Sequence, residues 1–251
     1  MSVSRRILGI SDSKSVFVSP QEAPLLADLI RKHTIADKTA LPTICYIGAA
    51  KGDRPERIAD FFDLAKRAGF QPTSLDMYAM KTGDANAYFD NVNAVFIDGG
   101  VTRNLIALLK EWDVTAALTK AYQQGTLIAG ASAGISMLFD WCISDSIKTN
   151  IQPLKGIGLL KGAVCAHYDA KAERRETLAE LMNTEPTAVP AFGVEDGVAI
   201  LFEDEAFVEA FTIHPEARLH LFKREQHHIS HTSMLGRRLD PVSLHSNHQL
   251  S

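Results

Sequence analysis

The sequence has few cysteines, and none of them is spaced for pairing. Cys45, Cys142 and Cys165 are the only three in 251 residues. Disulfide-rich secreted domains and zinc modules use closely spaced cysteine pairs, which this chain lacks. We therefore expect three buried free thiols, a reducing compartment such as the cytoplasm, and no metal site. No glycine-rich segment has the spacing of a phosphate-binding loop, so we also expect no cofactor.

The chain also lacks a strong charge of either sign and a long apolar run. Lys and Arg number 26 against 30 Asp and Glu, so the formal net charge is only −4, and nothing indicates a polyanion-binding surface. No segment approaches the roughly 20 apolar residues of a membrane-spanning helix. The apolar run that follows the two N-terminal arginines is too short for a secretory signal. We expect no nucleic-acid partner, no membrane partner and a cytoplasmic location.

Short apolar runs alternate with helical patterns through the first half of the chain. The runs at 43–48, 94–100 and 127–130 are rich in branched residues and end in glycine. Because they are continuous rather than alternating, they predict strands buried on both faces of a parallel sheet. The fold class expected is α/β, with a doubly wound, mostly parallel sheet that has helices on both faces.

The second half of the chain is less regular. The run at 197–211 predicts a C-terminal β-hairpin around Glu203, Asp204 and Glu205. In the first half of the chain, a capping box at 19–22 predicts one further helix start near the N-terminus. From residue 223 the sequence is polar and holds five of the nine histidines. We expect one α/β domain over 1–222 and a polar C-terminal extension over 223–251.

Ser132 lies between glycines in the stretch 130–134, which reads Gly-Ala-Ser-Ala-Gly. As a bare pattern this is weak, since chance produces it in about one chain in fifteen of this length. Its context strengthens it, because a predicted strand precedes it and a predicted helix follows, as in a nucleophile elbow. The structural alternative is a serine that caps a helix in a crowded turn.

A nucleophilic serine needs a base and a carboxylate that orients the base. Among the histidines, His167 closes the predicted strand at 162–166, and sites in open α/β sheets gather at such strand ends. Its alternative reading is an ordinary strand-end histidine. Glu195 lies on an apolar approach to a strand and is the carboxylate we favour. Its neighbour Asp196 is the alternative, although an Asp before Gly197 also has a structural use in a turn.

Together these residues resemble the peptidase E family, the aspartyl dipeptidases and their cyanophycinase relatives. Four stretches carry the resemblance, in the family's order: FIDGGVTRNLIALL (96–109), GASAGI (130–135), HYDAKAERR (167–175) and GVEDGVAI (193–200). The resemblance implies a fold similar to class I glutamine amidotransferases and a Ser132, His167 and Glu195 triad. It also implies an oxyanion hole from backbone N–H groups of Ala133 and of the turn at Gly99 and Gly100. The chain order of serine, histidine and acid differs from the serine, acid and histidine order of α/β-hydrolases.

One position departs from the family pattern. The aspartyl dipeptidases have an Asn after the two glycines, and this chain has Val101, so a preference for N-terminal Asp is in doubt. Arg174 and Arg175 are candidates for binding a substrate carboxylate, with a solvated first helical turn as the alternative. Arg103 is a weaker candidate of the same kind.

These expectations lead to one functional prediction with two alternatives. We expect a serine exopeptidase, dipeptidase-like, that hydrolyses short peptides through an acyl-enzyme. The alternatives are an esterase or amidase with a non-peptide substrate and a catalytically silent binding module. The expected partner is a short peptide, and a homodimer stays open.

Overall fold

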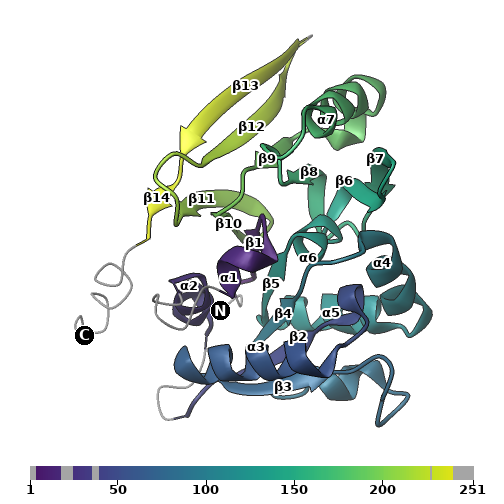
Figure 1. Cartoon of the computed structure of the whole chain (residues 1–251), viewed down its shortest axis with the longest axis vertical. Helices are drawn as coiled ribbons and strands as arrows, with labels where there is room; N and C mark the ends of the chain where they lie inside the picture. Colours follow the sequence, from purple (N-terminus) through teal and green to yellow (C-terminus); the bar gives the residue numbers. More distant parts are fainter. Residues whose placement is uncertain (1–3, 18–24, 36–39, 227, 240–251) are drawn as a thin grey trace.

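The protein folds around two β-sheets, of which the smaller lies above the larger in the view of Figure 1. The structure is a computed structural model, and it describes residues 4–17, 25–35, 40–226 and 228–239. The larger sheet has eight strands in the order β14-β11-β10-β1-β5-β4-β2-β3. The smaller sheet has six strands in the order β13-β12-β9-β8-β6-β7.

Five parallel strands form one side of the larger sheet, out to the edge strand β3. They are β1 (Arg6–Ile10), β5 (Leu127–Ala131), β4 (Ala94–Ile97), β2 (Thr43–Ile47) and β3 (Gln71–Leu75). β10 (Val198–Glu203) runs antiparallel to β1 and forms the predicted hairpin with β11 (Ala206–Thr212). The two-residue β14 (Arg237–Arg238) pairs in parallel with β11.

Helices cover both faces of this sheet, because consecutive strand residues point to opposite faces and those of β4 and β5 are all buried. Ile7 packs in the cluster that includes α4 (Thr102–Glu111) and α5 (Val114–Gln123). Leu8 packs on the other side, with α2 (Leu25–His33) and α3 (Pro55–Arg67). The doubly wound α/β class predicted from the continuous apolar runs is therefore confirmed.

The smaller sheet is the feature that the sequence patterns did not indicate. It contains β6 (Phe139–Ile147), β7 (Asn150–Lys155), β8 (Leu160–Ala166), β9 (Ala191–Val194), β12 (Arg218–Glu225) and β13 (His228–Leu235). Its helix α7 (Ala172–Thr184) packs against β8 through Leu178, Leu181 and Met182. β12 and β13 extend away from the body as a long hairpin (Figure 1).

The structure describes only part of the two chain ends. The expected boundary between 222 and 223 falls inside β12, so the polar extension begins within a strand and includes β13 and β14. Every residue of β13 is exposed or half-buried, so this strand has no apolar pattern that its sequence could show. The capping box at 19–22 and the tail at 240–251 lie outside the described residues.

Short helices and the remaining connections complete the architecture. They are α1 (Ser13–Val16), α6 (Ala133–Ser136), η1 (Ala49–Lys51), η2 (Ala85–Tyr88) and η3 (Pro186–Ala188). Cys45, Cys142 and Cys165 are buried free thiols, as predicted. Across the described ranges, the longest apolar helix falls short of what a bilayer crossing requires. The carboxyl ends of β1, β4 and β5 meet those of β8 and β9, and this junction holds Ser11, Ser132 and His167.

Candidate active site

Ser132 occupies a sharp turn between β5 and α6. Its backbone has φ 54° and ψ −108°, a conformation that costs a non-glycine residue free energy and that is enriched at functional sites. Its N–H donates to the carbonyl of Ile10 at 3.0 Å, which ties the turn to the end of β1. The strand, the strained serine and the following helix have the form that a nucleophile elbow requires.

The two glycines around Ser132 are required by close approach of the backbone. A Cβ at Gly130 would lie 2.5 Å from the carbonyl carbon of Gly134. A Cβ at Gly134 would collide with the carbonyl oxygen of Ile97 at the end of β4. The Gly-x-Ser-x-Gly spacing therefore lets α6 turn back directly against the strands that present the serine.

His167 lies where β8 ends and faces Ser132 across the junction of the two sheets. Its Nε2 is 2.8 Å from Oγ of Ser132. The backbone of His167 is also strained, with φ 54°, and its N–H donates to Oγ of the buried Ser11 at 2.8 Å. The structure thus brings together the serine and the histidine that the sequence singled out.

The carboxylate that contacts His167 belongs to Asp196 and not to Glu195. Nδ1 of His167 is 2.7 Å from Oδ1 of Asp196. Glu195 points to the other side, where its two oxygens lie 2.9 Å from Nε2 of His220 and 2.9 Å from the N–H of Arg218. The expected contact between Glu195 and His167 is therefore absent from the described structure, and Asp196 takes its place.

The turn after β9 explains this exchange of neighbours. Side chains of successive residues at a strand end point to opposite faces of the sheet. Only one of the two carboxylates can therefore point to the face on which the His167 ring lies. Gly197, with φ 83°, reverses the chain and donates its N–H to Asp12 at 2.9 Å. Asp196, which has a structural use in this turn, is therefore also the residue whose carboxylate contacts the imidazole of His167.

Asp196 is held as an anion by its surroundings. Burial by itself raises its pKa, but hydrogen bonds from His167 and Ser11 and the positive charge of Arg174 outweigh burial. The pKa of Asp196 therefore lies below its usual value. Ser11 takes part because its Oγ lies 3.1 Å from Oδ1 of Asp196 and 2.8 Å from the carbonyl of Val194. No sequence pattern had indicated Ser11.

The three expected oxyanion-hole residues differ in what their N–H groups contact. The N–H of Gly99 is used, since it donates to Oδ1 of Asp98 at 2.7 Å and to Oγ of Ser13 at 3.0 Å. Those of Gly100 and Ala133 have no hydrogen-bond acceptor among the described residues. Because α6 has only four residues, the N–H of Ala133 matters here more than any helix dipole.

Arg174 and Arg175, two of the arginines expected to bind substrate, form hydrogen bonds within the protein. Arg174 is 5% exposed; its guanidinium pairs with Asp145 at 3.1 Å and donates to the carbonyl of Ala166. Arg175 donates to the carbonyl of Tyr168, directly after His167. Both stabilise the loop around His167 in this structure, which favours the structural role for them.

The glycine turn supplies the other two expected substrate contacts. Arg103 has an exposed side chain, and its N–H donates to Ser146 at 3.1 Å. Val101 is half-buried, and its N–H donates to the carbonyl of Ala50 at 2.9 Å. The apolar side chain of Val101 supplies no hydrogen bond to a substrate.

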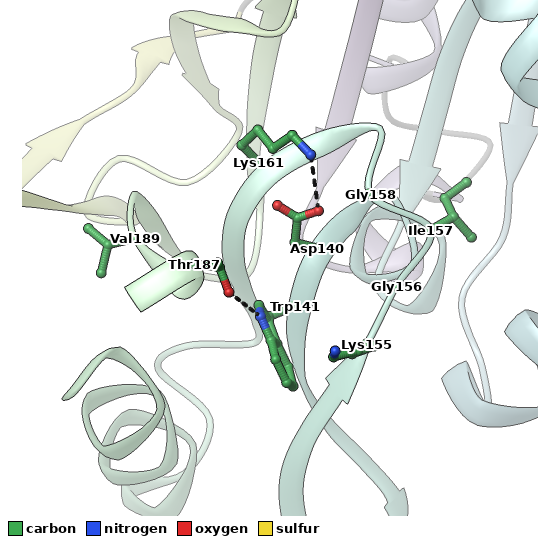
Figure 2. A pocket seen from close by; sticks show the side chains of 9 residues that line it. All are labelled: Asp140, Trp141, Lys155, Gly156, Ile157, Gly158, Lys161, Thr187 and Val189. Atoms are coloured by element: carbon green, nitrogen blue, oxygen red, sulfur yellow. Dashed lines mark hydrogen bonds and ion pairs between the residues drawn. The ribbon is translucent and has the colours of Figure 1, made fainter. Parts of the chain in front are cut away.

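An open pocket of about 480 Å³ lies elsewhere, between β6, β7 and η3 (Figure 2). Nε1 of Trp141 donates to Thr187, and Lys161 pairs with Asp140 along its wall. None of the residues around Ser132 lines it. Within the described ranges, no three His, Cys, Asp or Glu side chains are grouped to hold a metal ion.

The chain is similar in sequence to known peptidases. The family model for peptidase family S51 matches residues 13–210. The uncharacterized peptidase YgaJ of Bacillus subtilis (strain 168) is 27% identical over 193 residues, which make up 77% of this chain and 83% of that protein. Peptidase E of Streptomyces coelicolor (strain ATCC BAA-471 / A3(2) / M145) is 29% identical over 136 residues, 50% of this chain and 55% of that protein.

A solved structure shares the fold. The crystal structure of a peptidase from an acI-B1 Actinobacterium superposes with a TM-score of 0.68 at 16% identity, covering 94% of this chain and 96% of that one. The family model covers most of the chain, from the residues after β1 into the β10–β11 hairpin, and it includes Ser132, His167 and Asp196. The chain therefore belongs to peptidase family S51 and is a serine-type peptidase.

Proposed function

We propose that the protein is a serine exopeptidase that cleaves short peptides through Ser132, His167 and Asp196. The observation that carries the proposal is the continuous hydrogen-bonded line from Oγ of Ser132 through both ring nitrogens of His167 to Oδ1 of Asp196. With Asp196 ionised, Nδ1 holds the proton and donates to the carboxylate. Nε2 is then free to accept the serine proton.

In the first half of the reaction, Oγ of Ser132 attacks the scissile carbonyl carbon and its proton passes to Nε2 of His167. The carbonyl oxygen becomes an oxyanion, which the N–H groups of Gly100 and Ala133 stabilise. As the tetrahedral intermediate collapses, the C–N bond breaks and Nε2 returns the proton to the leaving amine. In the second half, water attacks the acyl-enzyme, gives its proton to Nε2 and releases the acid product with the serine restored.

Substrate and labelling experiments distinguish an exopeptidase from the two alternatives, an esterase or amidase and a silent binding module. Val101 offers no hydrogen bond at the glycine turn, so we leave the preferred substrate side chain open and test a dipeptide library with mass-spectrometric readout. Cleavage that requires a free N-terminal amine supports an exopeptidase. Cleavage confined to non-peptide esters or amides supports an esterase or amidase. Absence of fluorophosphonate labelling at Ser132 in the native protein supports a silent binding module.

The carboxylate assignment is tested by a matched pair of variants. Asp196→Asn is expected to lower kcat by several orders of magnitude, because an amide permits the wrong imidazole tautomer. Glu195→Gln is expected to keep kcat within about tenfold of the wild type, because Glu195 contacts His220 and Arg218 instead. The opposite ranking, with both variants folded, would refute the role of Asp196. Ser132→Ala should abolish turnover in a folded protein.

The compartment also belongs to the proposal. Three buried thiols without disulfides support a reducing environment, and we expect the protein in the cytoplasm. Fractionation of cells that express the full chain, with a periplasmic or secreted marker as reference, tests this expectation.

A further inference from the structure

A buried ionic cluster lies directly beneath the glycine turn. Asp98 is fully buried, and its Oδ2 accepts from Nε of Arg57 at 2.7 Å and from the hydroxyl of Tyr46 at 2.9 Å. Nζ of Lys51 lies 3.3 Å from both carboxylate oxygens. The proposed chemistry leaves this cluster without a role, although the next residue in the chain is Gly99.

The cluster contacts the turn through the N–H of Gly99. That N–H donates to Oδ1 of Asp98 and to Oγ of Ser13. On the far side of the turn, the N–H of Val101 donates to Ala50. The peptide group between Gly99 and Gly100 is thus anchored at both flanks, while its own N–H remains without an acceptor among the described residues.

A peptide between two glycines needs such anchors. Neither glycine has a Cβ to restrict rotation, so the group can turn over and present its carbonyl oxygen where the N–H now points. Gly100 has φ 146°, and a Cβ there would collide with the carbonyl of Ala50. The residue type needed for close packing is therefore also the type that leaves the peptide orientation unspecified.

We propose that Asp98 is a positioning residue that holds the glycine turn with the N–H of Gly100 directed at the substrate oxyanion. The inference rests on the proposed function, because it assigns the Gly100 N–H to the oxyanion hole. Asp98 itself touches no reacting atom. It acts by occupying the Gly99 N–H, which fixes the start of the turn and leaves the next N–H for the substrate.

The two cations explain how a carboxylate is tolerated so close to a developing negative charge. An unpaired anion here would destabilise the oxyanion by charge repulsion. Lys51 and Arg57 carry two positive charges against the single negative charge of Asp98, so the cluster has a net positive charge. Burial by itself raises the pKa of Asp98, and the hydrogen bond from Arg57 with the charges of Lys51 and Arg57 lowers it below its usual value. Asp98 thus remains an acceptor for the Gly99 N–H.

The test compares Asp98→Asn with Asp53→Asn in the full chain. Both changes turn a buried carboxylate that accepts a backbone N–H into an amide, but Asp53 accepts from Met77 and not from the glycine turn. We expect Asp98→Asn to lower kcat about 10- to 100-fold with KM within about threefold, since the turn serves the transition state more than the ground state. Asp53→Asn should keep kcat within about twofold.

A peptide boronic acid supplies a second readout, because its tetrahedral adduct places an oxygen in the oxyanion hole. Asp98→Asn should weaken its inhibition by about the factor lost from kcat, while the affinity for a cleavage product stays within about threefold. Equal losses of kcat in Asp98→Asn and Asp53→Asn would overturn the proposal. So would an unchanged kcat in folded Asp98→Asn.

A milder pair decides the question if Asp98→Asn does not fold. Ser13→Ala removes the second acceptor of the Gly99 N–H, and Thr126→Val removes a buried hydroxyl that donates to Val92 outside the site. We expect a kcat loss of about three- to tenfold for Ser13→Ala only; equal kcat values overturn the proposal. Wild-type protein that neither cleaves peptides nor labels at Ser132 indicates instead that the proposed function is wrong.

Discussion

At the residue scale, the site depends on atoms that are missing as much as on those present. Gly130 and Gly134 have no Cβ, and each would otherwise overlap neighbouring backbone. The strain at Ser132 and His167, both with positive φ, is maintained because packing around them leaves no relaxed alternative. Small changes at these positions should therefore have large effects.

Gly134→Ala is expected to lower the free energy of unfolding by about 1–3 kcal/mol, because the added methyl group meets the carbonyl of Ile97 and backbone must shift. It should also lower kcat at least about tenfold by displacing α6 and the N–H of Ala133. Gly83→Ala is the control, since its Cβ would enter open space. Urea denaturation and steady-state kinetics measure both; a neutral Gly134→Ala would contradict the packing argument.

At the element scale, loops at the carboxyl ends of the strands are tied by buried polar side chains. Asp53, after β2, accepts the N–H of Met77, after β3, at 2.8 Å. Asp53 is only 6% exposed. Burial raises its pKa from 3.8 to about 6, and the charge of Asp76 adds to the increase. The hydrogen bond from Met77 favours the ionised form, but burial outweighs it, so ionisation of Asp53 destabilises the folded state.

The sign of the pH effect follows from the direction of this shift. The unfolded chain loses the Asp53 proton near pH 4 and the folded chain near pH 6, so ionisation reduces stability as pH rises through this window. Asp53→Asn cannot ionise. Relative to the wild type, the variant should gain about 1–3 kcal/mol in free energy of unfolding between pH 4 and pH 7, measured by urea denaturation at each pH. A difference that does not change with pH would show that Asp53 titrates normally.

At the scale of the whole molecule, the site exists only where the two sheets meet. Ser11 follows β1 of the larger sheet, and its Oγ contacts the N–H of His167 and the carbonyl of Val194 in the smaller sheet. Ser132 follows β5 of the larger sheet and His167 follows β8 of the smaller one, so the proposed nucleophile and its proposed base belong to different sheets. Their alignment depends on how those sheets are joined.

Ser11→Ala is expected to lower the free energy of unfolding by about 1–3 kcal/mol, since it leaves buried polar groups without a partner. It should also lower kcat by about tenfold or more, because Asp196 loses a hydrogen bond and His167 loses its backbone anchor. Thr119→Ala is the control, because it removes only a hydrogen bond from a hydroxyl group to a backbone carbonyl within α5. Retention of full kcat in Ser11→Ala would show that the sheets align the site without it.

The sequence by itself determined the α/β class, because continuous branched runs fit only strands buried on both faces. It placed Ser132 in a tight turn between a strand and a helix, because the two glycines around it allow close approach of the backbone, and it directed attention to His167 through a strand end. These are local signals, carried by residues within a few positions of one another. The four family stretches added the order of the site along the chain.

Only the tertiary structure decided between Glu195 and Asp196, because adjacent carboxylates differ in direction and not in chemistry. It also revealed the second sheet, in which β8 and β9 join the β6–β7 and β12–β13 hairpins, which are far apart in the sequence. Ser11 and Asp98 are functional candidates for the same reason: their contacts join β1, β2 and β4 to residues far along the chain. A hydrogen bond across such a separation leaves no period or spacing in the sequence, so it is fixed only when the sheets assemble.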